Sequence, residues 1–291
     1  MAPTNEKALE PRTPRPGMPI DEATMDAWLA DAKSGKMGWT EFAERILAKQ
    51  NPAANEDQPD LDRGRRCAFG EVIYGSGKAP DGILSISQKL FESGQREVLV
   101  TRVDEAAFRA IEELNQKLRT PLQMRYEPQG RTLRLSQNEV HELNVPPCPA
   151  LAAVNVAVVT AGTTDRAVGM EAVETLRWMG VNTHWLQDVG VAGPYRLLGH
   201  LDELRQCAVV VVVAGMEGAL ASVVGGLVPC PIIAVPTSVG YGSNFEGITT
   251  LLSMMSSCAA GVTVVNIDGG FKGGYIAGLM AYQVAKAAEA K

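Results

Sequence analysis

The sequence predicts an α/β protein whose C-terminal half is a doubly wound, three-layer parallel sheet, preceded by a small α+β domain and an N-terminal helical segment. Three observations lead to this prediction. From Asn155 onwards, short strands that are apolar throughout alternate with helical stretches, which is the pattern of a parallel sheet covered on both faces. Before that point the elements are mixed, with a two-strand pattern around Gln129-Gly130. The 291 residues, 46% of them hydrophobic, suffice for two domains.

The chain divides into three expected segments. Residues 1–20 are charged and rich in proline, and we expect a flexible tail there. Residues 21–150 should hold a helical hairpin, split near Ser34-Gly35, a linker over 51–64 and then the small α+β domain. A proline-rich join leads into the parallel-sheet domain, residues 151–291.

The individual elements follow from apolar periodicity and from the turns between them. In the small domain we expect strands at 71–75 and 97–103, helices at 81–92 and 104–118, and two strands within 124–136. In the second domain we expect strands within 155–162, 182–190, 207–215, 231–236 and 262–267, and helices at 166–179, 195–204, from 217, at 244–256 and at 275–290.

Composition excludes several classes of protein. The formal charge of -6 comes without a basic stripe, so nucleic-acid binding is not expected. No stretch has the length of a membrane span, and the N-terminus lacks the apolar core of a signal peptide. The 5 cysteines are scattered and include no CxxC pair, which argues against a disulfide framework or a zinc site. We therefore expect a cytoplasmic protein with free thiols and no membrane contact.

Ligands of a doubly wound sheet bind at the carboxyl ends of the strands. The first strand of the second domain runs into Thr163, Thr164 and Asp165, which offer hydroxyls and free N–H groups to an anion where a helix begins. An equally good interpretation from spacing alone is that Thr164 or Asp165 only caps that helix. The segment is not a GxGxxG fingerprint, so a standard nicotinamide dehydrogenase is disfavoured.

Three more strand ends carry polar or glycine-rich loops. The second is followed by Asp188, Tyr195 and Arg196, and the third by Gly215 and Gly218. The fourth leads into the glycine-punctuated loop 235–247, whose hydroxyl and N–H donors can wrap a phosphate or a ribose. Each loop also has a purely structural interpretation, as a solvated surface or as helix packing.

Cys258 precedes the fifth strand, within Ser257-Cys258-Ala259. It falls at the amino end of its own strand, away from the expected ligand edge. Composition alone favours a buried structural cysteine, because free cysteine is among the most buried residue types.

The order of the motifs indicates a family. VAVVTAGTTDRAVGMEA, VVVVAGMEGALASVVGGLVPCPIIAVPTSVGYG and VTVVNIDGGFKGGYIAGLMA together resemble the aminoimidazole ribonucleotide (AIR) carboxylase, or PurE-like, domain. Adding LDRGRRCAFGEVIYGSGK, DVGVAGPYRLL and SMMSSCAAGVTVVNIDGG, the chain resembles the LarB family. These are the pyridinium-3,5-biscarboxylic acid mononucleotide synthases of nickel-pincer cofactor biosynthesis, which serves lactate racemase maturation.

The resemblance implies an activity and its substrates. A LarB protein acts as carboxylase and hydrolase on nicotinic acid adenine dinucleotide, adding CO2 from bicarbonate to the pyridinium ring and releasing AMP. A thiolate that adds to the ring would make its neighbouring carbon nucleophilic. The resemblance further implies Mg2+ at the diphosphate, no organic cofactor beyond the substrate, and a homo-oligomer, expected to be an octamer.

By the same motif matching, Cys258 is the expected nucleophile. Asp165, Asp268 and Lys272 are the other catalytic candidates. The expected substrate-binding residues are Thr163, Thr164, Arg196, Gly215, Met216, Glu217, Gly218, Gly240, Tyr241, Gly242 and Asn244.

One position departs from the family pattern. The segment GPYRLL has Tyr195 where a histidine precedes the arginine. A true AIR carboxylase or mutase, the alternative function, needs an acid/base histidine near the first two strand ends, and His184 and His200 do not fall there. A non-catalytic nucleotide-binding protein is the third alternative.

Overall fold

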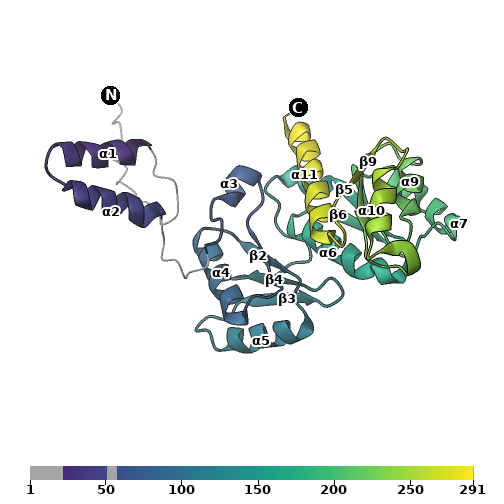
Figure 1. The fold of residues 1–291 in the computed structure, drawn as a ribbon, viewed down its shortest axis with the longest axis horizontal. Helices are drawn as coiled ribbons and strands as arrows, with labels where there is room; N and C mark the ends of the chain where they lie inside the picture. Colours follow the sequence, from purple (N-terminus) through teal and green to yellow (C-terminus); the bar gives the residue numbers. More distant parts are fainter. Residues whose placement is uncertain (1–21, 51–57, 291) are drawn as a thin grey trace, which may run out of the picture. The chain divides into compact units, whose positions relative to one another are not determined.

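The strands after Asn155 form one five-stranded sheet in the computed structural model, which describes residues 22–50 and 58–290. Neighbouring strands are parallel, in the order β6-β5-β7-β8-β9 (Figure 1). The strands are β5 (Asn155–Thr160), β6 (Asn182–Leu186), β7 (Val209–Ala214), β8 (Ile232–Pro236) and β9 (Val262–Val264). The chain runs from β5 to one side, then returns to the other side at β7. The predicted doubly wound sheet is confirmed, with its switch point between β5 and β7.

Helices cover both faces of this sheet. One face carries α6 (Arg166–Trp178) and α11 (Gly270–Glu289). The other carries α7 (Pro194–Leu198), α8 (Leu201–Leu204), α9 (Ala219–Gly225) and α10 (Ile248–Met255). The valines 209–213 of β7 alternate between the two cores and are all buried. Because burial of each valine contributes about 1.5–3 kcal/mol, a strand that is apolar on both faces is stable only between two helical layers.

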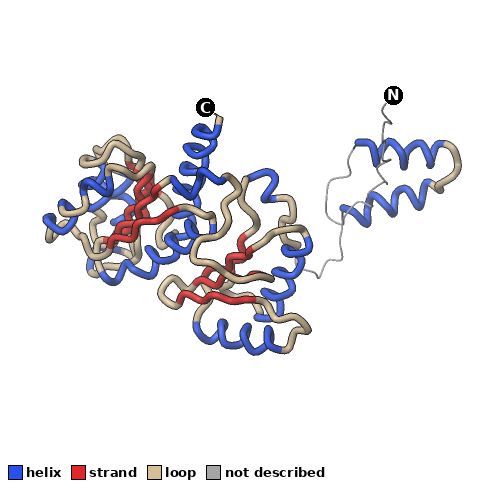
Figure 2. Tube along the Cα trace, turned by 180° about the vertical axis from the view of Figure 1, so that it is seen from behind, coloured by secondary structure: helices blue, strands red, loops and turns tan. Residues whose placement is uncertain are grey.

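A second sheet of four strands, in the order β1-β2-β4-β3, precedes the first (Figure 2). Its strands are β1 (Val72–Tyr74), β2 (Glu97–Thr101), β3 (Gln123–Glu127) and β4 (Thr132–Ser136), with β1 and β2 parallel and the other pairs antiparallel. The short helix α3 (Arg63–Cys67) precedes β1, and α4 (Pro80–Glu92) and α5 (Glu105–Gln116) accompany the sheet. Alternate residues of β2 and β4 join α4 and α5 in one core. The small α+β domain is therefore as predicted.

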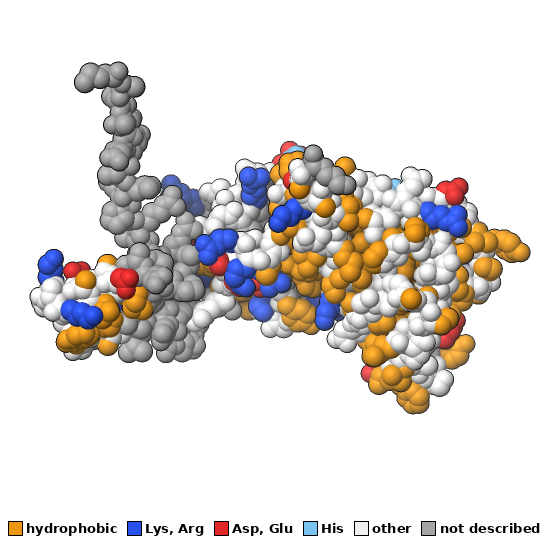
Figure 3. All heavy atoms as spheres, turned by 90° about the horizontal axis from the view of Figure 1, so that it is seen from above, with side chains coloured by type: hydrophobic (Ala, Val, Ile, Leu, Met, Phe, Trp, Pro, Cys, Tyr) orange, Lys and Arg blue, Asp and Glu red, His pale blue; other side chains and the backbone are white. Residues whose placement is uncertain are grey.

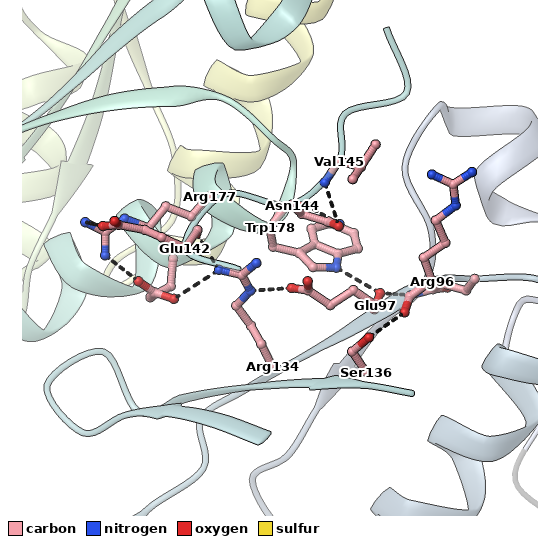
Figure 4. A network of polar contacts seen from close by, with 11 residues as sticks. Arg96, Glu97, Arg134, Ser136, Glu142, Asn144, Val145, Arg177 and Trp178 are labelled. Carbon is pink, nitrogen blue, oxygen red and sulfur yellow. Dashed lines mark hydrogen bonds and ion pairs between the residues drawn. The ribbon is translucent and has the colours of Figure 1, made fainter. Parts of the chain in front are cut away.

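The opposite face of the small sheet meets α6. Leu99 of β2 belongs to the same core as α6 and α11. A buried polar network lies beside it (Figure 4): Arg134 donates from Nε to Glu97, and from Nη1 to the Glu142 carbonyl at 2.7 Å. Trp178 Nε1, from α6, donates to the Glu97 carbonyl at 3.1 Å. Residues 63–291 accordingly form one compact unit.

The other unit, residues 1–62, holds the helical hairpin. It consists of α1 (Glu22–Lys33) and α2 (Trp39–Gln50), which confirms the predicted helices. The turn between them uses Gly35 at φ +77°. The predicted tail, residues 1–20, and residues 51–57 of the predicted linker lie outside the described residues, and the boundaries at 20 and 150 stay predictions. Over residues 22–50 and 58–290, no helix combines the length and apolarity that a bilayer crossing needs.

The largest differences from the expected helix bounds occur in three places. The helix expected at 195–204 is two, α7 and α8, because the chain breaks at Gly199-His200. α10 begins at Ile248 rather than at 244, since Phe245, Glu246 and Gly247 all have positive φ. α11 begins at Gly270 rather than at 275. Gly274 lies inside this helix at a point where α6 packs closely against it. A Cβ at Gly274 would lie 2.6 Å from the Ala172 carbonyl oxygen of α6, so glycine is needed there.

Candidate active site

Five loops leave the carboxyl ends of the parallel strands and meet along one side of the sheet, which we call the carboxyl edge. They comprise residues 161–165, 187–193, 215–218, 237–247 and 265–269. Those after β5 and β7 flank the switch point, where ligands of such sheets bind. The opposite side, where the strands begin, is the amino edge.

Asp165 is the most buried of the predicted polar residues at the carboxyl edge. The Asp165 residue is only 3% exposed. Oδ1 accepts the Thr237 hydroxyl at 2.7 Å, and Oδ2 accepts the Gly162 N–H at 2.9 Å. Burial raises the pKa of Asp165, while the hydrogen bonds from Thr237 and Gly162 oppose the rise. Asp165 therefore caps its own turn, in the 3-10 helix η2 (Thr163–Asp165), as one of the two interpretations from sequence expects. It also joins two strand-end loops, and its contact with a ligand stays a prediction.

The loops after β7 and β8 are pressed together. A Cβ on Gly215 would lie 2.3 Å from the Val239 carbonyl oxygen, so only glycine fits there. Met216 has a left-handed backbone (φ +52°) and donates its N–H to the Val239 carbonyl at 2.8 Å. Gly218, at φ +68°, then turns the chain into α9. Gly215 and Gly218 thus pack closely against the protein itself, against the loop after β8 and against α10. Their predicted close approach to a ligand stays a prediction.

The buried side chain of Asn244 stabilises the loop after β8 through hydrogen bonds to its backbone. Asn244 ends the 3-10 helix η3 (Gly242–Asn244) and is buried. Its Nδ2 donates to the carbonyls of Val239 at 3.1 Å and Met216 at 3.4 Å, and its Oδ1 accepts the Gly247 N–H. A Cβ on Gly240 would lie 2.0 Å from that Nδ2. The Asn244 amide is thus occupied by the protein, so only the backbone and the exposed side chains of this loop are accessible to a ligand.

The closing turn after β9 brings Asp268 to the same edge. Its Oδ1 accepts the Ser238 N–H at 2.9 Å, and its own N–H donates to the Pro236 carbonyl at 2.8 Å. The Asp268 charge also contributes to the raised pKa of Asp165, whose main cause is burial. Lys272 lies in the first turn of α11 and is exposed. The structure therefore brings three of the four predicted catalytic residues to one edge.

The remaining predicted contacts lie on the outside of these loops. Arg196 of α7 pairs with Asp188, Nη1 to Oδ2 at 2.8 Å, and both are about half exposed. Tyr195 projects into solvent at 84% exposure, which is compatible with a contact to a ligand or another chain. The following predicted residues of the carboxyl edge are also exposed: Thr163, Thr164, Met216, Glu217, Gly240, Tyr241 and Gly242.

Cys258 is not at this edge. It is exposed and lies between the end of α10 and the start of β9, at the amino edge. The neighbouring Ser257 hydroxyl is 2.7 Å from the Ser222 hydroxyl of α9, which fixes the loop beside the thiol. The exposure contradicts the buried cysteine that composition favours. Within one chain, however, the structure does not bring Cys258 to Asp165.

The set of predicted catalytic and substrate-binding residues omits three residues that the carboxyl edge depends on. Thr237 supplies a hydroxyl to Asp165 from 72 residues further along the chain. Arg102, from the small domain, donates to the buried carboxylate of Glu171 at 2.7 Å. Thr237 could be found as a hydroxyl directly after a buried strand. Nothing in the local sequence marks Arg102 or Glu171.

The residues present do not form a metal centre by themselves. No cluster of three or more His, Cys, Asp or Glu side chains suited to a metal ion occurs over residues 22–50 and 58–290. The two carboxylates of the carboxyl edge, Asp165 and Asp268, already accept hydroxyl or backbone donors. Any Mg2+ would need most of its ligands from a bound diphosphate and water.

Two segments of the chain match two known protein families. Residues 155–291 match the AIR carboxylase family, and residues 54–137 match the LarB/PurE-like N-terminal domain. Fold, loops and family matches together define a carboxylase-type α/β protein.

The chain is also 38% identical, over 258 residues, to the uncharacterized protein MJ0165 of Methanocaldococcus jannaschii, covering 86% of this chain and 93% of that protein. The chain described here belongs to the LarB family, with a C-terminal PurE-like domain.

Proposed function

We propose that this chain is a pyridinium-3,5-biscarboxylic acid mononucleotide synthase, which carboxylates nicotinic acid adenine dinucleotide and cleaves its phosphoanhydride to release AMP. The observation that carries the proposal is the exposure of Cys258 in a chain of the LarB family. An exposed sulfur can reach a substrate, whereas a buried structural cysteine is inert. CO2, drawn from bicarbonate, is the second substrate, and no further organic cofactor is needed.

The proposed role of Cys258 meets a chemical need. A pyridinium ring is electrophilic and does not attack CO2. Addition of the Cys258 thiolate para to the ring nitrogen forms a C–S bond and leaves an enamine-like ring whose neighbouring carbon is nucleophilic. That carbon attacks CO2, loses its proton, and the C–S bonding pair returns to sulfur. The ring is aromatic again, one hydrogen has been replaced by a carboxylate, one proton is released, and no oxidant is required.

The carboxyl edge is suited to an anionic substrate that must lose a proton. Burial raises the pKa of Asp165, and a carboxylate of raised proton affinity is a better proton acceptor. Lys272 stands in the first turn of α11, where a cation opposes the helix dipole by about 0.3–1 kcal/mol. A carboxylate or phosphate bound there would offset that cost. The exposed loop 238–243 offers further N–H and hydroxyl groups to the dinucleotide.

A second copy of the chain would unite the two edges. α10 has 8 residues, about 12 Å at 1.5 Å per residue, and runs from the carboxyl edge to the amino edge. Ile248, Leu252 and Met255 form an exposed apolar stripe along it, and Figure 3 shows hydrophobic side chains gathered on the surface of the larger unit. Two α10 helices packed antiparallel would place the Cys258 of each chain beside the 237–247 loop of the other. We therefore propose a homo-oligomer, with the octamer that the family resemblance implies as its expected size.

Phosphoanhydride hydrolysis is the second half of the proposed activity. We propose that Mg2+ accompanies the diphosphate rather than residing in the protein, in line with the lack of a metal-ligand cluster over the described residues. We place the reaction in the cytoplasm, where the five unpaired cysteines stay reduced.

The AIR carboxylase alternative finds less support. His184 and His200 both approach Glu203, at 2.5 and 3.4 Å, rather than the carboxyl edge. An imidazole for acid/base work at that edge is therefore not provided by either.

The test is product analysis by mass spectrometry after incubation of the full chain with nicotinic acid adenine dinucleotide, 13C-bicarbonate and Mg2+. The proposal expects AMP together with a pyridinium mononucleotide that carries one added 13C carboxylate. AMP without the labelled carboxylate would identify a plain hydrolase. Neither product, with aminoimidazole ribonucleotide carboxylated instead, would establish the alternative.

A further inference from the structure

Arg102 connects the small domain to the closing turn of the candidate active site. It directly follows β2 and so belongs to none of the five strand-end loops. Its Nε donates to Glu171 Oε1 at 2.7 Å and its Nη2 to Glu171 Oε2 at 3.1 Å. The same Nη2 donates to the main-chain carbonyl of Asp268. One side chain thus holds both a buried carboxylate of α6 and the backbone of the closing turn.

The closing turn depends on such contacts because Asp268 has a left-handed backbone, φ +54°. A non-glycine residue in this region costs about 1–3 kcal/mol and persists only where its surroundings impose it. Three contacts do so here: the Asp268 N–H bonds the Pro236 carbonyl, its carboxylate accepts the Ser238 N–H, and its carbonyl accepts Arg102. Only the Arg102 contact comes from outside the parallel-sheet domain.

Glu171 extends the connection to the start of α11. Its side chain is only 3% exposed, and its Oε2 also accepts the Phe271 N–H at 3.1 Å. A Cβ on Gly270 would lie 2.1 Å from the Val168 carbonyl oxygen and 2.8 Å from Glu171 Oε2. The first turn of α11 is therefore held tightly against α6, with Arg102 neutralising the charge at the contact.

Arg102 is itself held in place by the small domain. It has a left-handed backbone at φ +59°, and so has Arg131 at φ +51° in the turn between β3 and β4. The Arg131 carbonyl accepts the N–H of Val103, the residue after Arg102, at 2.7 Å. Two strained positions meet where the small domain touches α6, and strain of this kind concentrates at functional sites.

We propose that Arg102 is a positioning residue of the active site: through the Asp268 carbonyl and Glu171, it fixes where the Asp268 carboxylate lies at the carboxyl edge. The inference rests on the proposed function, and it assigns the small domain a part in catalysis. A purely structural linker would only hold the two sheets together. Trp178 makes such a linking contact, to the Glu97 carbonyl at the start of β2, and does not touch the closing turn.

The experiment compares Arg102→Gln, Arg102→Lys and the control Trp178→Phe in the full chain. Hydrogen–deuterium exchange is followed in the peptide covering residues 262–275, and kcat and KM are measured with nicotinic acid adenine dinucleotide. For Arg102→Gln we expect exchange in that peptide to be faster by at least about tenfold, as loss of a charge-assisted hydrogen bond implies. We expect kcat to fall about tenfold, with KM changed less than about threefold. Arg102→Lys should lie between, because lysine keeps the charge but not the fork of donors.

Trp178→Phe should lower the melting temperature. The exchange rate of residues 262–275 and the kinetic constants should stay as in the unchanged protein. The proposal is overturned if a folded Arg102→Gln keeps its kcat, or if Trp178→Phe lowers kcat as much. Should Arg102→Gln not fold, Arg102→Lys decides: an unchanged kcat overturns the proposal and a reduced one supports it. If the unchanged protein shows no turnover, the proposed function fails on its own account. Hydrogen–deuterium exchange then still decides. Faster exchange in the Arg102 variants, but not in Trp178→Phe, supports the positioning contact. Exchange equal to that of the unchanged protein overturns it.

Discussion

At the carboxyl edge of the five-stranded sheet, Asp165 is buried and accepts hydrogen bonds from two loops. At the amino edge, Cys258 is exposed among small residues. The first edge holds hydrogen-bonded carboxylates, and the second carries the exposed thiol of Cys258. The chemistry proposed above needs both. We therefore propose that assembly of chains is part of building the site.

The largest effect is expected from removing the thiol. Cys258→Ala should reduce carboxylation about 10⁴-fold or more, as for other covalent nucleophiles, with the fold unchanged. Cys230→Ala is the matched control, because Cys230 also precedes a strand at the amino edge and burial raises its pKa. Mass spectrometry of the labelled mononucleotide measures both. Normal product formation by Cys258→Ala would rule out the covalent mechanism.

The next largest effect tests the carboxyl edge. Asp165→Asn should lower kcat about 100-fold, the contribution typical of a positioned acid or base. Asp188→Asn is its control, because Asp188 lies on the outer part of the same edge in a half-exposed ion pair with Arg196. Steady-state kinetics distinguish them. Equal effects of the two substitutions would remove Asp165 from the catalytic role.

The apolar stripe on α10 is the proposed bridge between the edges. Leu252, 57% exposed in the single chain, would be buried in an antiparallel pair of α10 helices. Leu252→Asp should weaken association about 100-fold or more, because it removes about 1.5–3 kcal/mol of apolar burial from each copy and adds a charge. Analytical ultracentrifugation measures the effect, with Val145→Asp, exposed away from α10, as control. Activity and assembly should be lost together.

A mixture of two inactive variants sharpens the comparison further. If each site combines Asp165 of one chain with Cys258 of another, a hybrid of Asp165→Asn and Cys258→Ala chains contains one intact site. Random pairing in twofold dimers should restore about a quarter of the activity. The measurement is turnover after unfolding and refolding the variants together, compared with the variants refolded separately. No recovery in assembled hybrids would place both residues in a site of one chain.

The smallest expected effect concerns stability and pH. Burial raises the pKa of Asp165 above 3.8, so the native state binds this proton more tightly than the unfolded state. Stability from this group is therefore fully present below 3.8 and is lost as pH rises through the raised value. Asparagine does not titrate. Thermal melts should show Asp165→Asn gaining stability relative to the unchanged protein as pH rises through this window, and a pH-independent difference would contradict the assignment.

The strands were predictable because the sequence itself records two-sided burial. The valines 209–213 admit no polar face, so a parallel sheet between helices is the only stable environment for them. The start of α11 was not predictable in the same way. The segment that contains Gly270 and Gly274 is rich in glycine, which is typical of a turn. Only the close approach of α6 shows why glycine is needed inside a helix there.

The sequence predicted a residue of the candidate site where its own position along the chain marks it. It did not predict residues that act through a partner distant in the sequence. Asp165 stands in the loop that follows the apolar strand β5, where a helix begins, and this position marks it in the sequence. Its partner Thr237 lies 72 residues away, and the Arg102–Glu171 pair is separated by 69 residues. Such pairings depend on how two sheets and α6 pack together. The sequence around each residue does not indicate that packing.

The exposure of Cys258 has a consequence for oxidative stress. Susceptibility of a thiol to peroxide follows its accessibility and thiolate character. Cys148 and Cys207 are buried, while Cys258 stands open to solvent. An opening that admits a pyridinium ring also admits a peroxide molecule, which would convert the sulfur to a sulfenic acid that cannot add to the ring. If Cys258 is the nucleophile of the proposed synthase, we expect its activity to be lost on treatment with peroxide and to return when the thiol is reduced.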